Sequence, residues 1–176
     1  MSAIFWKEVK SYFYSPIAYI LIGFFTLLTS LFFWPLLIYQ SADFNSVLDT
    51  MGFILLFIVP VLTMRILAED RKNGTEVLLL TSPASLTSVV FGKYLASLFV
   101  FGIMTAITFI YPLILIAFGG PLTAKLVGGY IGFLLLGASF ISVGVFASSL
   151  TENQVIAVVI SFVSLLIMWL IDYISS

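Results

Sequence analysis

Residues 16–39 read PIAYILIGFFTLLTSLFFWPLLIY, an apolar run that contains no charged side chain. A helix needs roughly 20 apolar residues to cross a bilayer, so this run can form one span. Of the 176 residues in the chain, 62% are hydrophobic and 9% are charged, against about 25% charged in an ordinary soluble domain. The apolar residues lie in long continuous runs rather than in short alternating segments. We therefore predict an all-α fold, a polytopic helical membrane bundle.

Charged residues separate five apolar runs of this kind. Ser15 is a suitable N-cap for the first run, and Pro16 is suited to the first helical position. Pro60 is expected to kink the second span, and Pro112 to interrupt the third. The five predicted spans cover residues 16–39, 50–64, 86–118, 126–150 and 153–171.

Residues 1–14 are predicted to form an amphipathic helix that lies on the membrane surface before the first span. The alternative is an ordinary helical extension of that span. At about 100° per residue, apolar and polar side chains fall on opposite arcs: Phe5, Trp6, Val9, Tyr12 and Phe13 against Lys7, Glu8, Lys10 and Ser11.

The distribution of lysine and arginine predicts the orientation, because positive residues near span ends stay in the cytoplasm. Lys125 lies alone on one side of the predicted bundle. The other side collects the remaining basic residues: Lys7, Lys10, Arg65, Arg71, Lys72 and Lys93. We expect a multi-pass protein of the plasma (inner) membrane, with the N-terminus in the cytoplasm.

Composition excludes several functions. The net charge of −1 offers no basic field for nucleic acid. Without cysteine or histidine, the chain lacks a thiolate nucleophile, the commonest general base and the commonest zinc ligands, so neither a metal nor another cofactor is expected. Gly92-Lys93 is followed by Tyr94 and lacks the upstream glycine of a P-loop. The chain is therefore not expected to be an enzyme, and any ATPase must be a separate polypeptide.

Residues 65–85, between the second and third spans, are rich in charge. A helix that prolongs the second span is expected to end at Asn73-Gly74. Thr75 can cap a short new helix with Glu76 in its first turn, where the helix dipole favours an anion. Two interpretations stay open: a solvated loop on the membrane, or a helix that docks into a groove of a partner.

Glu69 also has two interpretations. It lies at helical spacing from Arg65 and from Lys72, so local ion pairs can account for it. Contact with a partner protein is the alternative.

Small residues mark the fourth predicted span. Gly128 and Gly132, and likewise Gly144 and Ser148, stand four positions apart, a spacing that lets helices approach closely. Packing within the subunit is one interpretation. A subunit interface or the lining of a transport pathway is the other.

Several short motifs are similar to those of ABC-2 type transporter permeases. The central motifs are Leu62-Thr63-Met64-Arg65, Ala68-Glu69-Asp70, Gly74-Thr75-Glu76, Leu79-Leu80, Pro83 and Gly92-Lys93-Tyr94. Further stretches resemble the gliding-motility-associated permease branch: Lys7-Glu8, residues 12–19 (YFYSPIAY) and residues 148–154 (SSLTENQ).

The resemblance implies a single ABC-2 type transmembrane domain over residues 1–176, with an interfacial helix at 1–14 and a cytoplasmic coupling loop at 65–85. It also implies two permease subunits, identical or different, that work with cytoplasmic ABC ATPase subunits. The residues implied to couple to the ATPase are Glu69, Asp70, Arg71, Gly74, Thr75 and Glu76. Two features depart from the family pattern: Asp70 replaces a usual glutamate, and five spans are predicted where six are expected.

We therefore predict a membrane-spanning permease subunit of an ATP-driven ABC-2 type exporter. Two alternatives remain: a non-transporting membrane scaffold, and a stand-alone carrier or channel. No ionisable residue is predicted at mid-span, which disfavours a proton- or sodium-coupled carrier.

Overall fold

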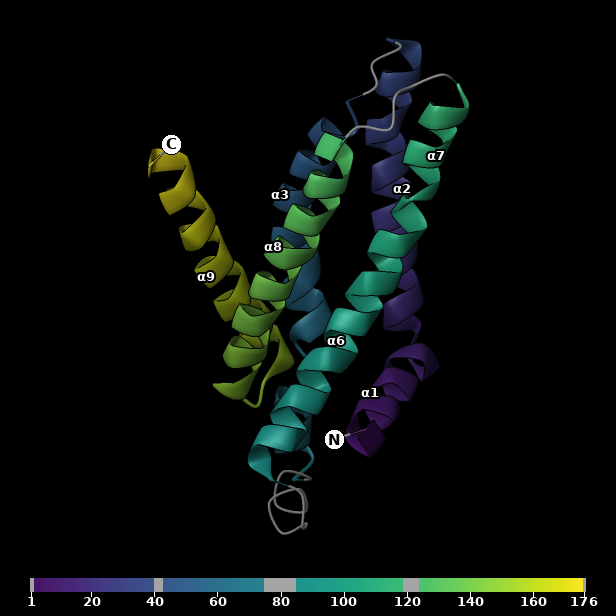
Figure 1. Cartoon of the computed structure of the whole chain (residues 1–176). Coiled ribbons are helices and arrows are strands. Elements are labelled where there is room, and N and C mark those ends of the chain that lie inside the picture. Colours follow the sequence, from purple (N-terminus) through teal and green to yellow (C-terminus); the bar gives the residue numbers. More distant parts are fainter. Residues whose placement is uncertain (1, 40–42, 75–84, 119–123, 176) are drawn as a thin grey trace.

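The computed structural model of the chain describes residues 2–39, 43–74, 85–118 and 124–175, which form helices and no strand (Figure 1). Five helical segments are long and apolar enough to cross a membrane, so the predicted all-α membrane bundle is confirmed. The helices are α1 (Ser2–Tyr14), α2 (Pro16–Ile38), α3 (Asn45–Thr63), α4 (Ala68–Lys72), α6 (Leu86–Thr108), α7 (Ile110–Ala117), α8 (Ala124–Ser149) and α9 (Gln154–Ser175).

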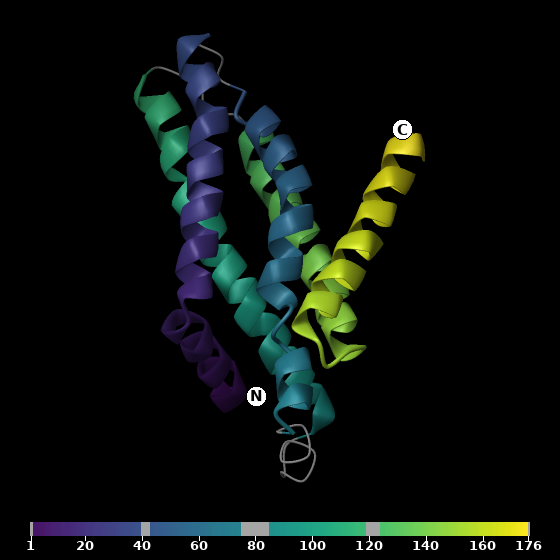
Figure 2. The same cartoon turned by 180° about the vertical axis from the view of Figure 1, so that it is seen from behind.

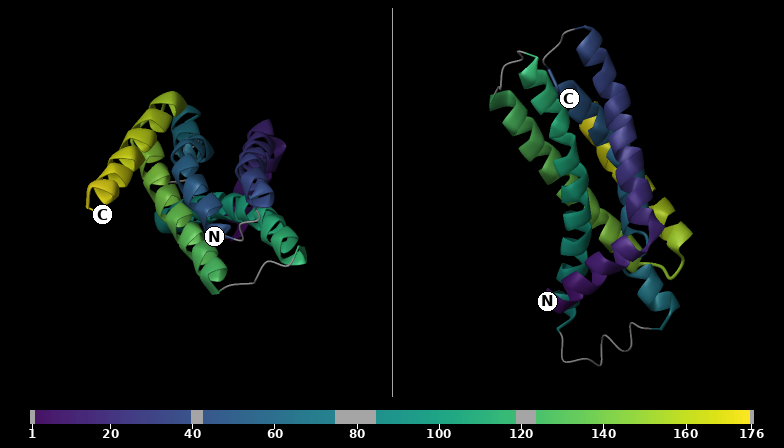
Figure 3. Two further views of the ribbon diagram at one scale, coloured as in Figure 1. Left: turned by 90° about the horizontal axis from the view of Figure 1, so that it is seen from above. Right: turned by 90° about the vertical axis from the view of Figure 1, so that its right-hand side faces the viewer.

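Helix α3 forms the centre of the bundle and contacts α2, α8 and α9, while α6 packs on α2 and α8 (Figure 3). Its Leu55, Leu56 and Val59 are fully buried, together with Phe101 of α6 and Ile141 of α8. Helix α1 packs across α6. Helix α9 leans away from the other helices toward its C-terminal end (Figure 2).

Helices α1 and α2 are separate because Ser15 breaks the chain between them. Ser15 has an extended backbone (φ −89°, ψ 142°), and its hydroxyl accepts a hydrogen bond from the Ile17 amide at 3.4 Å. Pro16 then occupies the first helical position, where a missing N–H costs nothing. The predicted cap is confirmed, and the alternative of a continuous helical extension is wrong.

Helix α3 is longer at its start than the predicted span, since it begins at Asn45 rather than residue 50. Asp49, taken as the boundary, lies in the helix with its side chain exposed, so it does not need to end the helix. At the other end, the predicted continuous helix up to Asn73-Gly74 is wrong. Helix α3 ends at Thr63, and a turn over residues 64–67 precedes α4.

The third span is interrupted at Phe109, between α6 and α7, as Pro112 predicts. Proline has no N–H for the carbonyl four residues earlier, which belongs to Thr108. The Tyr130 hydroxyl of α8 donates to this carbonyl at 3.1 Å, so the break is compensated from a neighbouring helix. Helices α8 and α9 match the fourth and fifth predicted spans, with α9 extending to Ser175.

Candidate functional site

The segment that joins α3 to the residues beyond α4 is folded against the bundle. We call residues 64–74 the coupling segment; it lies at the same end of the bundle as α1 (Figure 1). Helix α4 ends at Lys72, and Gly74 has a φ of 68°, a left-handed conformation that glycine adopts without steric cost. The predicted helix break at Asn73-Gly74 is confirmed.

Ser148 of α8 caps the start of α4 from outside the segment. Its hydroxyl oxygen accepts hydrogen bonds from the amides of Leu67 and Ala68, both at 3.1 Å, and donates to the Met64 carbonyl at 3.2 Å. The first amides of a helix need such partners, and Leu67 at the N-cap supplies none. The turn that interrupts the helix is thus stabilised by α8.

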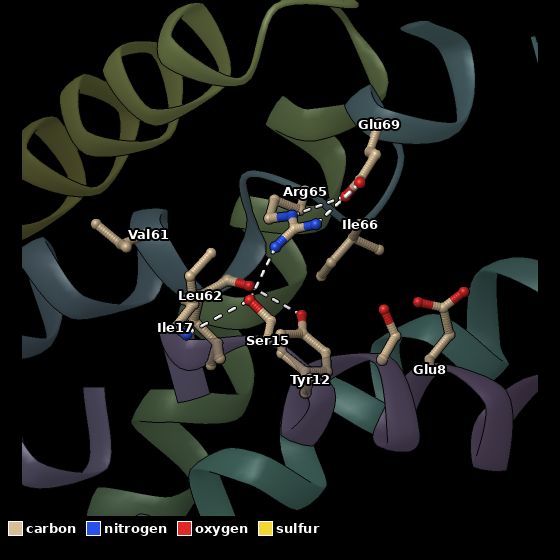
Figure 4. Close-up of a pocket in the computed structure, with 10 residues that line it drawn as sticks. Glu8, Tyr12, Ser15, Ile17, Val61, Leu62, Arg65, Ile66 and Glu69 are labelled. Atoms are coloured by element: carbon tan, nitrogen blue, oxygen red, sulfur yellow. Dashed lines mark hydrogen bonds and ion pairs between the residues drawn. The ribbon is translucent and has the colours of Figure 1, made fainter. Parts of the chain in front are cut away.

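Arg65 links the coupling segment to the start of α2. Its guanidinium donates to both carboxylate oxygens of Glu69, at 2.7 and 2.9 Å, and through Nη1 to the Ser15 hydroxyl at 3.1 Å (Figure 4). The first of the two ion pairs expected for Glu69 therefore forms. A bidentate pair fixes the planes of both side chains, so Arg65 holds α4 in a defined position relative to Ser15.

Lys93 joins three helices through charge. Its ammonium lies 2.9 Å from Glu8 of α1 and 2.7 Å from Asp70 of α4, and it donates to the Ile66 carbonyl at 2.8 Å. The Lys93 side chain is 3% exposed, and a charge so deeply buried needs such partners. We call Lys93, Glu8 and Asp70 the Lys93 cluster.

Tyr12 of α1 adds an uncharged link to the region where α1, the coupling segment and α6 meet, which we call the junction. Its hydroxyl donates to the Leu62 carbonyl of α3 at 2.8 Å and lies 3.2 Å from the Ser97 hydroxyl of α6. Burial raises the pKa of Tyr12 above its ordinary value, so the phenol keeps its proton and remains a donor. Helix α1 is therefore bound to α3, α4 and α6 at once.

The structure brings together some of the sequence-predicted coupling residues. The ion pair of Asp70 with Lys93 binds α4 to α6, while Glu69 pairs with Arg65 inside the coupling segment. Arg71 is partly buried and belongs to the same helix. Thr75 and Glu76 lie outside the described residues.

The four predicted packing residues of α8 divide into two pairs. At Gly144 a Cβ would collide with Thr63 of α3, and Ser148 bonds to the coupling segment, so both serve packing within the chain. At Gly128 and Gly132 a Cβ would meet nothing within 4 Å, and both are exposed. These two glycines face outward, a position that agrees with the second interpretation, a subunit interface or the lining of a pathway.

Sequence reasoning missed the close-packed Gly137, where a Cβ would collide with Phe101, and the roles of Lys93, Glu8 and Tyr12. The sequence places Lys93 among the charges that report orientation and in the Gly92-Lys93-Tyr94 motif, but predicts no partner for it. The signal that marks it is a lone cation inside an otherwise uncharged helix, which needs a partner when buried. Nothing in the spacing of Lys93, Glu8 and Asp70 reveals that they meet.

Within the described parts of the chain, no group of three or more acidic residues could hold a metal ion. Hydrogen bonds and ion pairs connect the coupling segment to the Ser15 cap of α2, to α6 and to α8, and through Lys93 to Glu8 of α1. Such connections can transmit a displacement of one short segment to several helices.

A polytopic helical membrane protein with a charged segment bound to its spans is the class that these features define. Residues 39–173 match the family described as ABC-2 family transporter protein. The chain belongs to this family and is a membrane permease of the ABC-2 type. No curated protein and no solved structure matches the chain.

Proposed function

We propose that the chain is the permease subunit of an ATP-driven exporter, in which the coupling segment and the residues that follow it receive force from a cytoplasmic ABC ATPase. The observation that carries the proposal is the attachment of this segment by polar contacts to the start of α2, to α6 and to α8, and through Lys93 to α1. A second permease subunit, identical or different, completes the translocation pathway between the two bundles. The proposed setting is the plasma (inner) membrane, with the N-terminus and the coupling segment in the cytoplasm.

The charge pattern supports this assignment. Helix α4 carries Glu69 and Asp70 in its first turn and Arg71 and Lys72 in its last. Negative charges therefore lie at the positive end of the helix dipole and positive charges at its negative end, which stabilises the helix. Because Glu69 and Asp70 are engaged by Arg65 and Lys93, they hold α4 on the bundle. Residues from Arg71 onward, including Thr75 and Glu76, are then the ones proposed to contact the ATPase.

Residues 12–19 and 148–154, which are similar to gliding-motility-associated permeases, both contact the coupling segment. This shared location supports placing the chain in that branch. Ser15 of the first stretch accepts a hydrogen bond from Arg65, and Ser148 of the second caps α4. Both stretches therefore contribute to the junction that holds the coupling segment.

Co-purification tests the partnership. Replacing residues 75–82 by a glycine-serine linker of equal length leaves Arg65, Asp70 and Ser148 in place, so the bundle should insert and fold as before. We expect a cytoplasmic ABC ATPase to co-purify with the parent chain from its native membranes and to be lost from the linker variant. An ATPase that stays bound to the linker variant would show that the contact lies elsewhere.

A charge reversal tests coupling separately from binding. Glu76→Lys should uncouple ATP hydrolysis from transport while membrane insertion is retained. Asp49→Lys is the matched control, because Asp49 is an exposed acid of α3 at the opposite end of the bundle. Equal coupling in the two variants would remove Glu76 from the proposed contact.

A further inference from the structure

An open cavity of about 640 Å³ lies where the chain turns from α1 into α2. Helix α1 contributes its polar face, and Arg65 of the coupling segment closes one side. Three cations and three hydroxyl groups line the cavity: Lys7, Lys10, Arg65, Ser11, Tyr14 and Ser15. Among the residues that the structure describes, no carboxylate belongs to this lining.

The charge of the cavity is not balanced by the protein. Arg65 is paired with Glu69, and Glu8, the acidic neighbour of Lys7, is turned to Lys93 instead. Lys7 and Lys10 are exposed, and neither forms an ion pair within the described part of the chain. Two like charges three positions apart on a helix repel each other. A bound anion would remove this repulsion.

The surroundings of the cavity indicate which anion. Tyr14 of the lining is exposed, and Trp6 of α1 and Tyr19 of α2 are exposed on the two helices that meet there; tyrosine and tryptophan favour the boundary between headgroups and hydrocarbon. Helix α2 begins at the same place and presents an exposed apolar row along its length: Ile20, Phe24, Leu27 and Leu31. A ligand here has a cationic pocket at one end and an apolar helix face at the other.

We propose that this cavity binds the headgroup phosphate of an anionic phospholipid. Lys7 and Lys10 supply the positive charge, the hydroxyls of Ser11 and Tyr14 donate hydrogen bonds, and the acyl chains lie along the exposed row of α2. Basic pockets at the membrane surface bind anionic lipid headgroups because their positive charges lie at the level of the headgroups. The site is independent of ATPase binding, since it uses the outer face of α1 and not residues beyond Arg71.

Native mass spectrometry of the full chain in detergent tests the site. The protein is titrated with phosphatidylglycerol, and in parallel with zwitterionic phosphatidylcholine. Preferential retention of phosphatidylglycerol is expected, with a Kd that rises about tenfold or more in K7Q/K10Q, because each surface lysine contributes to anionic lipid affinity. The control K72Q/K125Q loses the same charge at exposed positions outside the cavity and should bind as the parent does.

Several results would overturn the proposal. Equal retention of the two lipids, or unchanged phosphatidylglycerol binding in K7Q/K10Q, would show that the cavity does not recognise the anion. Displacement of the lipid by excess inorganic phosphate would identify free phosphate as the ligand. If K7Q/K10Q no longer binds the ATPase but still binds phosphatidylglycerol as the parent does, the two lysines belong to a protein contact and not to a lipid site. Both lysines are exposed, so their replacement should leave the fold intact. The single variants K7Q and K10Q measure the same effect if the double variant fails to fold.

Discussion

The two ends of the bundle are closed by different physical means. At the end that carries α1 and α4, the Lys93 cluster is buried among three helices. At the opposite end, aromatic rings stack instead: Tyr130 lies 4.1 Å from Phe109 and 6.0 Å from Phe44, measured between ring centroids. The ion pair of Lys125 with Asp43 at this end is exposed, at 3.2 Å.

This difference bears on how each end responds to change. Burial of apolar ring surface is non-directional, so a ring can shift slightly and keep most of the stabilisation that burial gives. A buried cation between two carboxylates has no such freedom, because displacing one partner leaves charge without compensation. The end with the Lys93 cluster is therefore the one suited to transmitting a movement, and the aromatic end is suited to holding helices together.

The largest expected effect comes from Lys93→Met. Removing the cation takes the ammonium of Lys93 away from the partly buried carboxylates of Glu8 and Asp70, and breaking a buried ion pair costs roughly 3–5 kcal/mol. Unfolding in mixed micelles, followed by circular dichroism, measures the loss. The triple variant Lys93→Met, Glu8→Gln, Asp70→Asn should recover much of it, since both carboxylates are then replaced by neutral amides. A loss of less than about 1 kcal/mol in Lys93→Met would contradict the buried cluster.

A smaller effect is expected from glycines of α8. Gly137→Ala places a methyl group against Phe101, and overpacking of this kind costs typically about 1–3 kcal/mol. Gly132→Ala is the matched control on the same helix, where open space predicts no loss and a slight gain in helix stability. If Gly132→Ala destabilises the chain as much as Gly137→Ala, the outward placement of Gly132 is wrong. A change in oligomeric state in that variant would instead support a subunit interface.

Tyr130→Phe should cost about 1 kcal/mol, the usual net contribution of one hydrogen bond. The Thr108 carbonyl, freed by Pro112, loses its donor in this variant while the stacking with Phe109 remains. Combining the change with Pro112→Ala tests the cause, because alanine supplies the missing N–H. The cost of Tyr130→Phe should then fall. An equal cost in the parent and in the Pro112→Ala variant would show that the Tyr130 hydroxyl does not compensate for the missing N–H of Pro112.

The smallest effect is expected from Asp43→Asn. Its ion pair with Lys125 is exposed on both sides, and such pairs contribute at most about 1 kcal/mol and frequently nothing measurable. Thermal unfolding at low and high salt should give nearly the same midpoint as the parent. A loss comparable to that of Lys93→Met would contradict the contrast between the two ends.

The sequence predicted much of the fold because apolar length and helix signals act locally. Uncharged runs predicted the five spans, Ser15-Pro16 predicted the start of α2, and Pro112 predicted the break at Phe109. The start of α3 was predicted too late because Asp49 was taken for the end of a loop. Sequence alone does not show that this polar residue lies on the exposed side of the helix. The turn over residues 64–67 has no glycine or proline to mark it, and it depends on Ser148 from α8.

Helices that span a membrane could be inferred from the amino-acid sequence, because the cost of exposing a backbone to lipid leaves no other choice for such apolar runs. Motifs around residues 62–94 further pointed to the ABC-2 family. The burial of Lys93 between Glu8 and Asp70, the inward packing of Gly144 and the outward position of Gly132 emerge only when the helices are assembled. Those facts depend on which helix faces touch, and contacts between residues up to 85 positions apart are set by packing rather than by local spacing.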